Sequence, residues 1–120
     1  MKMKTSLCTA TLTAILLASS SLVWSADKSA GEALWHQSFG KTEAGEIKSC
    51  TTCHSQDLKQ VGRHITTGKP IEPMAVSVNP QRYTDPEKIE KWFKRNCKWT
   101  LDRECTQTEK ENILAYLKSL

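Results

Sequence analysis

The chain contains 120 residues, of which 25% are charged, and its formal net charge is +4. This length predicts one small domain, and the modest charge gives no indication of binding to nucleic acid or to a membrane surface. A domain of this size buries only a limited apolar core by itself, and no internal repeat extends it.

The N-terminal segment has the layout of a secretory signal peptide. Two lysines near the start precede a mostly apolar stretch from Leu7 to Val23, and Ser25 provides a small residue at the cleavage position. Several threonines and serines make this stretch too polar for a stable transmembrane span. We therefore expect residues 1–25 to be removed on export and residues 26–120 to form the mature domain in the periplasm.

Export would leave four of the five cysteines and a net charge of +2, from 15 basic and 13 acidic residues. Cys50 and Cys53 belong to a motif described below. Cys97 and Cys105 remain as an even pair in an oxidising compartment, which predicts a disulfide bond between them.

The first helix of the mature domain is predicted at residues 30–39, where Leu34, Trp35 and Phe39 are apolar near helical spacing. A glycine directly afterwards provides a stop. Gly31 has no side chain, so it either allows another helix to approach closely or is a tolerated surface glycine.

The central motif is Cys50-Thr51-Thr52-Cys53-His54, which has the C-x-x-C-H spacing of a c-type haem attachment site. Two thiols at this spacing can each form a thioether with a haem vinyl group, and the next residue offers an imidazole nitrogen to the iron. A thioredoxin-type redox pair requires a preceding strand, and residues 45–49 show no strand pattern. The motif predicts one covalent haem c on Cys50 and Cys53, with His54 as the proximal iron ligand.

The segment after the motif is predicted to be a helix followed by a long loop. Apolar residues at i, i+3 and i+7 favour a helix over residues 56–66, whereas three prolines indicate an ordered loop over residues 68–84. Met74 in this loop is the mature domain's only methionine. It is a candidate for the second iron ligand, and the alternative is apolar packing on the porphyrin. We expect His36 and His64 to face solvent.

A strong helix start follows, with Asp85 at the N-cap and Pro86 at the first helical position. Trp92 belongs to a core-facing apolar stripe in the helix predicted at residues 85–96, and Asn96 ends this stripe. Burying an amide without a partner costs about 1–3 kcal/mol. Asn96 therefore needs a partner. The two possible partners are the haem iron and the free backbone groups at the end of a helix.

The C-terminal part is predicted to contain a tight loop at residues 98–104 and a last helix. Thr106 and Glu109 form a capping box at the start of that helix, and its apolar residues share one face. The expected fold is an all-α cytochrome c domain, with its first and last helices crossing over the haem pocket.

Several stretches resemble the monohaem cytochromes of the sphaeroides haem protein family, namely residues 68–73, 79–86, 90–97 and 102–106. The most specific part is Arg95-Asn96-Cys97, with a second cysteine eight residues after Cys97. Together with the haem motif, the resemblance covers most of residues 50–120, while the N-terminal helix matches cytochromes c only in general. It implies a class I cytochrome c fold.

The resemblance also implies an unusual set of iron ligands. His54 would be the proximal ligand and Asn96 the distal ligand of ferric iron, beside a Cys97–Cys105 disulfide. On reduction the asparagine would leave the iron and open a site for oxygen, carbon monoxide or nitric oxide. Family members are linked to dihaem and membrane b-type cytochromes as electron donors. An enzyme that transforms oxygen or nitric oxide is a further interpretation, although no general base or peroxidase-type residue pair stands out.

The identity of the second ligand separates two functions. An amide oxygen is a weak, hard donor that suits Fe(III) better than Fe(II), so a one-electron reduction weakens its bond to iron. A methionine sulfur favours ferrous iron and keeps the site closed. Asn96 ligation therefore predicts a gas-binding haem protein, and Met74 ligation predicts a simple electron carrier.

Overall fold

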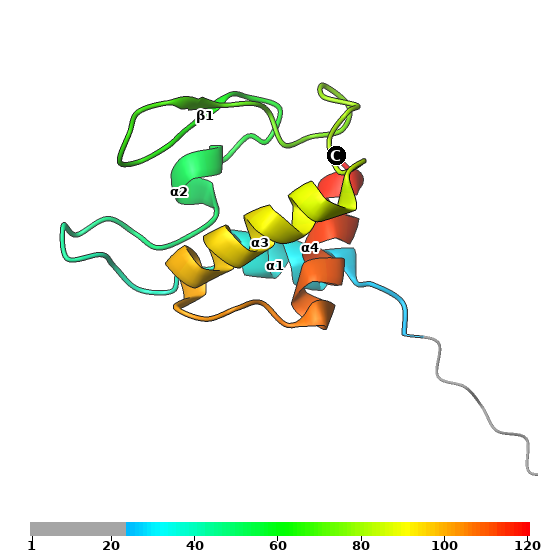
Figure 1. Cartoon of the computed structure of the whole chain (residues 1–120), viewed down its shortest axis with the longest axis horizontal. Helices are drawn as coiled ribbons and strands as arrows, with labels where there is room; N and C mark the ends of the chain where they lie inside the picture. Colours follow the sequence, from blue (N-terminus) through cyan, green and yellow to red (C-terminus); the bar gives the residue numbers. More distant parts are fainter. Residues whose placement is uncertain (1–23) are drawn as a thin grey trace, which may run out of the picture.

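The computed structural model describes residues 24–120, which are mainly helical (Figure 1). The predicted signal peptide, residues 1–25, lies almost entirely outside the described residues. The elements in chain order are α1 (Lys28–His36), α2 (Thr51–His54), β1 (Gly62–Arg63), β2 (Pro70–Ile71), α3 (Pro86–Leu101) and α4 (Gln107–Lys118). The predicted all-α class is confirmed, and the described residues add one small two-stranded sheet.

The helices α1 and α4 pack closely against each other, as predicted for the first and last helices. Gly31 lies against the backbone of α4, and a Cβ atom added there would overlap the carbonyl oxygen of Asn112. Asn112 also holds the start of α1, because its Oδ1 accepts a 2.7 Å hydrogen bond from the backbone N of Asp27. Of the two interpretations of Gly31, close helix approach is therefore correct.

The ends of α1 lie earlier than the predicted range of residues 30–39. Asp27 caps the helix by accepting hydrogen bonds of 2.8 and 3.2 Å from the backbone N atoms of Ser29 and Ala30. Gln37 has an extended backbone (φ −66°, ψ 139°), so the helix ends before Phe39. The side-chain cap at Asp27 thus fixes a start that apolar spacing alone placed too late.

Gly31→Ala is expected to destabilise the haem-containing protein by about 1–3 kcal/mol, because overpacking this contact forces α1 and α4 apart. Ala33→Ser, at an exposed position of the same helix, is the matched control and should change stability little. Denaturant unfolding of both variants tests this expectation. An unchanged unfolding midpoint for Gly31→Ala would contradict the close packing.

The predicted helix over residues 56–66 is wrong, because this segment forms turns and the strand β1. β1 pairs antiparallel with β2, with Gly62 opposite Ile71. A Cβ atom at Gly62 would overlap the carbonyl oxygen of Cys53, so the glycine lets β1 approach the haem motif. This tertiary contact overrides the i, i+3, i+7 pattern. The predicted loop over residues 68–84 is otherwise irregular apart from β2.

The helix α3 is longer than predicted, which changes the place of Asn96 within it. Asp85 caps its start as predicted, accepting two hydrogen bonds from backbone N–H groups. The helix ends at Leu101, and Asp102 stops it with a left-handed backbone (φ 60°). The loop predicted at residues 98–104 is therefore wrong over its first half. Asn96 lies inside the helix, where it cannot cap a helix end.

The predicted capping box begins α4. The backbone N of Glu109 donates to Thr106 Oγ1 at 3.2 Å, and the backbone N of Thr106 donates to Glu109 Oε2 at 2.8 Å. The Arg103 guanidinium donates two further hydrogen bonds of 2.7 and 2.8 Å to the same carboxylate. These contacts, with the Arg103 hydrogen bonds as the largest cause, lower the pKa of Glu109 to about 2.

Glu109→Gln is expected to lower the free energy of unfolding at neutral pH by up to about 1 kcal/mol, the usual limit for an exposed ion pair. Because the folded-state pKa lies below the ordinary value of 4.5, ionised Glu109 stabilises the fold above that pH. This stabilisation is lost as the pH falls from 4.5 towards 2. The stability gap between wild type and variant, measured by denaturant unfolding, should close over that range. A stability difference that did not change with pH would contradict the stabilising role of ionised Glu109.

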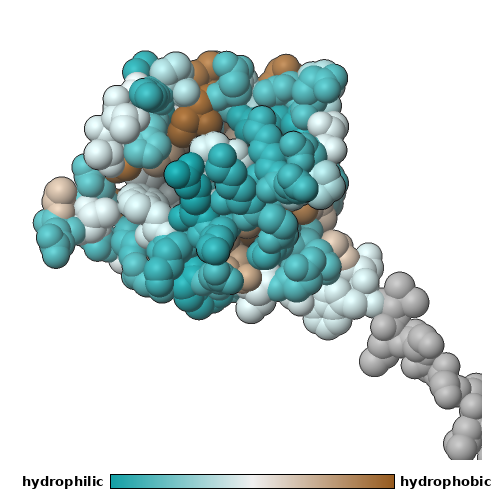
Figure 2. Space-filling model, viewed as in Figure 1, coloured by the Kyte–Doolittle hydropathy of each residue, from teal (hydrophilic) through white to brown (hydrophobic). Residues whose placement is uncertain are grey.

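The hydrophobic core is small and joins α1 and α4 to the loops that follow the haem motif. Its buried members are Trp35, Leu58, Met74, Ile113, Tyr116 and Leu117. Figure 2 shows that the face over α3 is mainly hydrophilic, with hydrophobic residues visible towards the upper edge. Within residues 24–120, no helix is long and apolar enough to cross a membrane.

Candidate haem site

The short helix α2 gathers the three residues of the predicted attachment motif into one turn. Cys50 is its N-cap, and the backbone N of His54 donates to the carbonyl oxygen of Cys50 at 3.2 Å. Cys50 and Cys53 are free, half-buried thiols. Thr52 anchors the turn to the preceding chain, because its Oγ1 donates a 2.5 Å hydrogen bond to the carbonyl oxygen of Ile47. Both thiols and the imidazole are thus held in one rigid segment.

The His54 imidazole is suited to binding a metal. Its Nδ1 is buried without a hydrogen-bond partner, and the Trp35 ring lies with its centroid 5.4 Å away. Burial, with a smaller contribution from the positive charge of Arg82, lowers the pKa of His54 to about 4. The imidazole is therefore neutral at physiological pH, which is the form that coordinates iron.

The Cys50 thiol is also kept neutral by its surroundings. Burial raises its pKa to about 11, and the nearby Cys53 adds a smaller effect in the same direction. A buried, protonated thiol is a poor redox nucleophile, since the thiolate is the reactive form. This environment fits a cysteine that ends as a stable thioether better than one that exchanges disulfides.

Hydrogen bonds to the backbone N and to the carbonyl oxygen of Met74 hold this residue in the core. Its backbone N donates to Leu58 O at 2.9 Å, and Tyr83 Oη donates to Met74 O at 2.8 Å. Arg82 Nε donates to Pro73 O at 3.0 Å. The Met74 side chain is 8% exposed and belongs to the hydrophobic core. The protein itself therefore supplies its packing partners.

The side chain of Asn96 has a different environment. It is exposed on α3, at i+4 from Trp92 and three residues before Trp99. Trp92 is 44% exposed and Trp99 is 37% exposed. The core-facing stripe predicted for this helix is therefore wrong for Trp92 and Asn96, which the protein leaves uncovered. Within residues 24–120, the Asn96 side chain makes no hydrogen bond to another side chain.

These features fit a haem. Two indole rings flanking an amide give α3 an apolar face that a flat, apolar group can cover. Phe93, on the neighbouring face, packs against the core and anchors the helix. The His54 imidazole and the thiols of Cys50 and Cys53, which form no disulfide, supply the remaining attachment chemistry. The described residues contain no cluster of three or more His, Cys, Asp or Glu side chains that could hold a metal ion.

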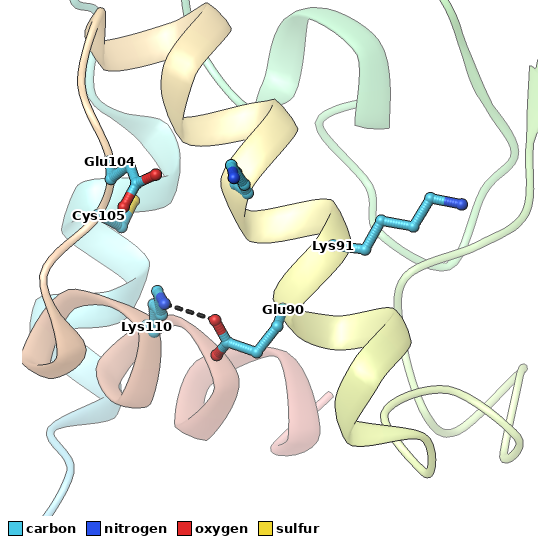
Figure 3. A pocket seen from close by; sticks show the side chains of 6 residues that line it. Glu90, Lys91, Glu104, Cys105 and Lys110 are labelled. Atoms are coloured by element: carbon cyan, nitrogen blue, oxygen red, sulfur yellow. Dashed lines mark hydrogen bonds and ion pairs between the residues drawn. The ribbon is translucent and has the colours of Figure 1, made fainter.

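The sulfur atoms of Cys97 and Cys105 lie in disulfide contact, with the two Cα atoms 5.6 Å apart. Cys105 also borders a cavity of about 290 Å³, lined by Glu90, Lys91, Lys94, Glu104, Cys105 and Lys110 (Figure 3). Lys110 Nζ and Glu90 Oε2 form an ion pair of 2.6 Å across it. Because charged side chains dominate this cavity, it does not suit a porphyrin.

Thiol labelling of the unfolded, unreduced mature protein is expected to find neither Cys97 nor Cys105 free. The even pair in an oxidising compartment and the separation of the Cα atoms support this pairing. Labelling after reduction, followed by peptide mass spectrometry, is the positive control. Two labelled cysteines before reduction would refute the disulfide.

The other two histidines have partners of their own. His64 is exposed, and its Nδ1 accepts hydrogen bonds from the backbone N atoms of Thr66 and Thr67. His36 is exposed, as predicted, but its Nε2 lies 3.3 Å from Tyr116 Oη. Neither this pair nor the Trp35–His54 pair was predicted from the sequence. Each joins residues far apart in the chain, so no local pattern marks it.

Comparison with known proteins supports one family. The family described as a domain of unknown function, DUF1924, matches residues 22–117. The cytochrome c-type protein SHP of Cereibacter sphaeroides is 44% identical over 95 residues, which cover 77% of this chain and 70% of that protein. Cytochrome c'' of Methylophilus methylotrophus is 39% identical over 87 residues, covering 72% of this chain and 60% of that protein.

Solved structures agree with these relatives. Oxidised SHP, described as an oxygen-binding cytochrome c, is 41% identical with a TM-score of 0.72, and the match covers 79% of this chain and 83% of that chain. Oxidised cytochrome c'' from Methylophilus methylotrophus is 36% identical with a TM-score of 0.69, covering 79% and 76%. The chain therefore belongs to the sphaeroides haem protein family, has its class I cytochrome c-like fold, and carries covalent haem c.

Proposed function

We propose that this protein is a periplasmic monohaem cytochrome that accepts electrons and binds a diatomic gas after Asn96 leaves the reduced haem iron. In this proposal Cys50 and Cys53 form the thioethers, His54 is the proximal ligand and Asn96 is the distal ligand of ferric iron. The haem supplies the redox-active iron and the coordination position that the gas occupies. The signal peptide of residues 1–25 directs export of the mature domain.

The observation that carries the proposal is the contrast between Asn96 and Met74. The Asn96 amide is exposed on α3, on the same face as two exposed indoles, Trp92 and Trp99. Met74 is buried in the core, and hydrogen bonds hold its peptide on both sides. An amide that the protein leaves exposed is free to bind iron, whereas Met74 already has apolar packing partners.

The placement of Asn96 within α3 also favours a reversible ligand. The helix ends at Leu101, so Asn96 has no helix-end backbone group to cap. The amide can leave the iron by rotation about its side-chain bonds, without a change in α3. A neutral oxygen donor binds Fe(II) more weakly than Fe(III), so reduction itself favours its release.

The relatives support a gas-binding role. SHP is described as an oxygen-binding cytochrome c, and a study of cytochrome c'' describes haem-ligand detachment. Oxygen, nitric oxide and carbon monoxide are the candidate ligands for the present protein. A dihaem or membrane b-type cytochrome is the proposed electron donor. Turnover of oxygen or nitric oxide would extend the same site to an enzyme.

Carbon monoxide binding to the ferrous protein tests this proposal. Stopped-flow mixing should show fast binding that depends on gas concentration, because no strong ligand must first leave the iron. Asn96→Ala should bind at a similar rate, since the asparagine has already left in the ferrous state. Slow binding that Met74→Leu accelerates would instead support a closed His54/Met74 electron carrier.

A further inference from the structure

An aromatic side chain lies directly beside the proposed proximal ligand. The Trp35 ring centroid is 5.4 Å from that of His54, with the ring planes tilted by 40°. Trp35 is only 4% exposed and belongs to the hydrophobic core. A buried indole in contact with an iron ligand is placed to exchange an electron with the haem.

Trp35 is poorly equipped to keep the positive charge that loss of an electron would leave. Its Nε1 is buried and has no hydrogen-bond partner. A buried charge without compensation is costly, and no acceptor is in place to take the indole proton. An oxidised Trp35 would therefore take an electron from a neighbouring residue.

Tyr116 is the candidate neighbour, because the Nδ1–H tautomer of His36 offers an acceptor for its proton. It belongs to the same core cluster as Trp35 and is 8% exposed. Its Oη lies 3.3 Å from Nε2 of His36, the residue that follows Trp35 in α1. Burial and the negative charge of Glu32 raise the pKa of Tyr116, so it remains a phenol until it is oxidised.

We propose that Trp35, Tyr116 and His36 form an aromatic relay that returns an electron to a haem oxidised by hydrogen peroxide. Hydrogen peroxide would take two electrons from the ferrous haem as its O–O bond breaks, and Tyr116 returns one electron to the haem through Trp35. The O–H bond of Tyr116 breaks and its proton moves to His36 Nε2, which leaves a neutral tyrosyl radical and an imidazolium. The exposed His36 then releases the proton to solvent. The proposal rests on the proposed function above, because the distal position that Asn96 leaves on reduction admits the peroxide.

Two further aromatic residues, Tyr83 and Trp92, lack these features. Tyr83 Oη donates to the carbonyl oxygen of Met74 at 2.8 Å, and an amide carbonyl is not a base that can take its proton. Lys91 Nζ and Arg95 lie 6.0 and 5.6 Å from the Trp92 ring. Their positive charges disfavour a radical cation at Trp92. The contacts therefore select Tyr116 as the end of the relay.

The test is electron paramagnetic resonance of the ferrous haem protein, frozen shortly after mixing with one equivalent of hydrogen peroxide. Wild type should show a tyrosyl radical, and Tyr116→Phe should lose it. Tyr83→Phe is the matched control, because it removes the other tyrosine and should leave the signal unchanged. Trp35→Phe should lower the radical yield, and His36→Leu should shift the radical g value because the hydrogen bond is lost.

Carbon monoxide binding, measured on each variant, separates the possible failures and shows that the variant has folded around its haem. Wild type that binds the gas but forms no Tyr116 radical overturns the relay and leaves the gas-binding function intact. A signal that survives Tyr116→Phe, or that disappears in Tyr83→Phe, also overturns it. Absence of both gas binding and the radical overturns the two proposals together. A spin trap that mass spectrometry finds attached to the peptide containing Tyr116 would support the relay independently.

Discussion

Asn96→Ala is expected to convert the ferric haem from low-spin to high-spin, with water or no ligand in the distal position. The amide would be the distal donor of ferric iron, and alanine offers no donor atom. Asn96 is exposed and makes no side-chain hydrogen bond within residues 24–120, so its removal should disturb the fold little. Optical and electron paramagnetic resonance spectra of the ferric protein measure this change.

Met74→Leu is the matched control for that substitution. Leucine conserves volume and polarity at a core position, so the expected loss of stability is below about 1.5 kcal/mol. The ferric spectrum should remain that of wild type. If Met74→Leu produced the high-spin spectrum and Asn96→Ala did not, the distal assignment would be reversed.

The second large effect is expected at the attachment motif. Replacing both Cys50 and Cys53 by serine should abolish covalent haem, because serine cannot form a thioether with a vinyl group. Haem staining after denaturing electrophoresis should disappear, and acidified organic solvent should extract any remaining haem. The protein should also lose most of its stability, since the exposed Trp92 and Trp99 would keep no apolar partner.

Replacing both Cys97 and Cys105 by serine is the control for this experiment. It removes two cysteines from another part of the fold, so covalent haem staining should persist. In the chain-entropy model the lost disulfide would cost about 2.5 kcal/mol for a loop of this length. Covalent staining that survived in the Cys50/Cys53 double variant would contradict the assignment of these residues.

Local sequence chemistry predicted the features that depend on neighbouring residues. The cap at Asp85 and the capping box of Thr106 and Glu109 each combine a side-chain acceptor with nearby backbone N–H groups, and both are present. For Gly31 the sequence left close approach and a tolerated surface glycine open, and the structure decides for close approach. The C-x-x-C-H motif predicted the haem, and the relatives confirm this cofactor.

The errors arose where distant contacts decide the local structure. Gly62 packs against Cys53, so its segment forms a strand although its apolar residues are spaced as in a helix. The end of α3 at Leu101 could not be predicted from the spacing of Cys97 and Cys105. The helix continues past Cys97, and the few residues after Leu101 are enough to bring the two Cα atoms to 5.6 Å. The exposure of Trp92 was missed because the stripe pattern does not distinguish packing on protein from packing on a haem.

The most direct test of the central claim is resonance Raman spectroscopy of the wild-type haem protein in both oxidation states. We expect low-spin ferric iron with Asn96 in the distal position and five-coordinate, high-spin ferrous iron after its release. The same measurement on Met74→Leu should give the same two spectra. A low-spin ferrous spectrum that Met74→Leu abolishes would contradict the gas-binding function and identify an electron carrier with His54 and Met74 as ligands.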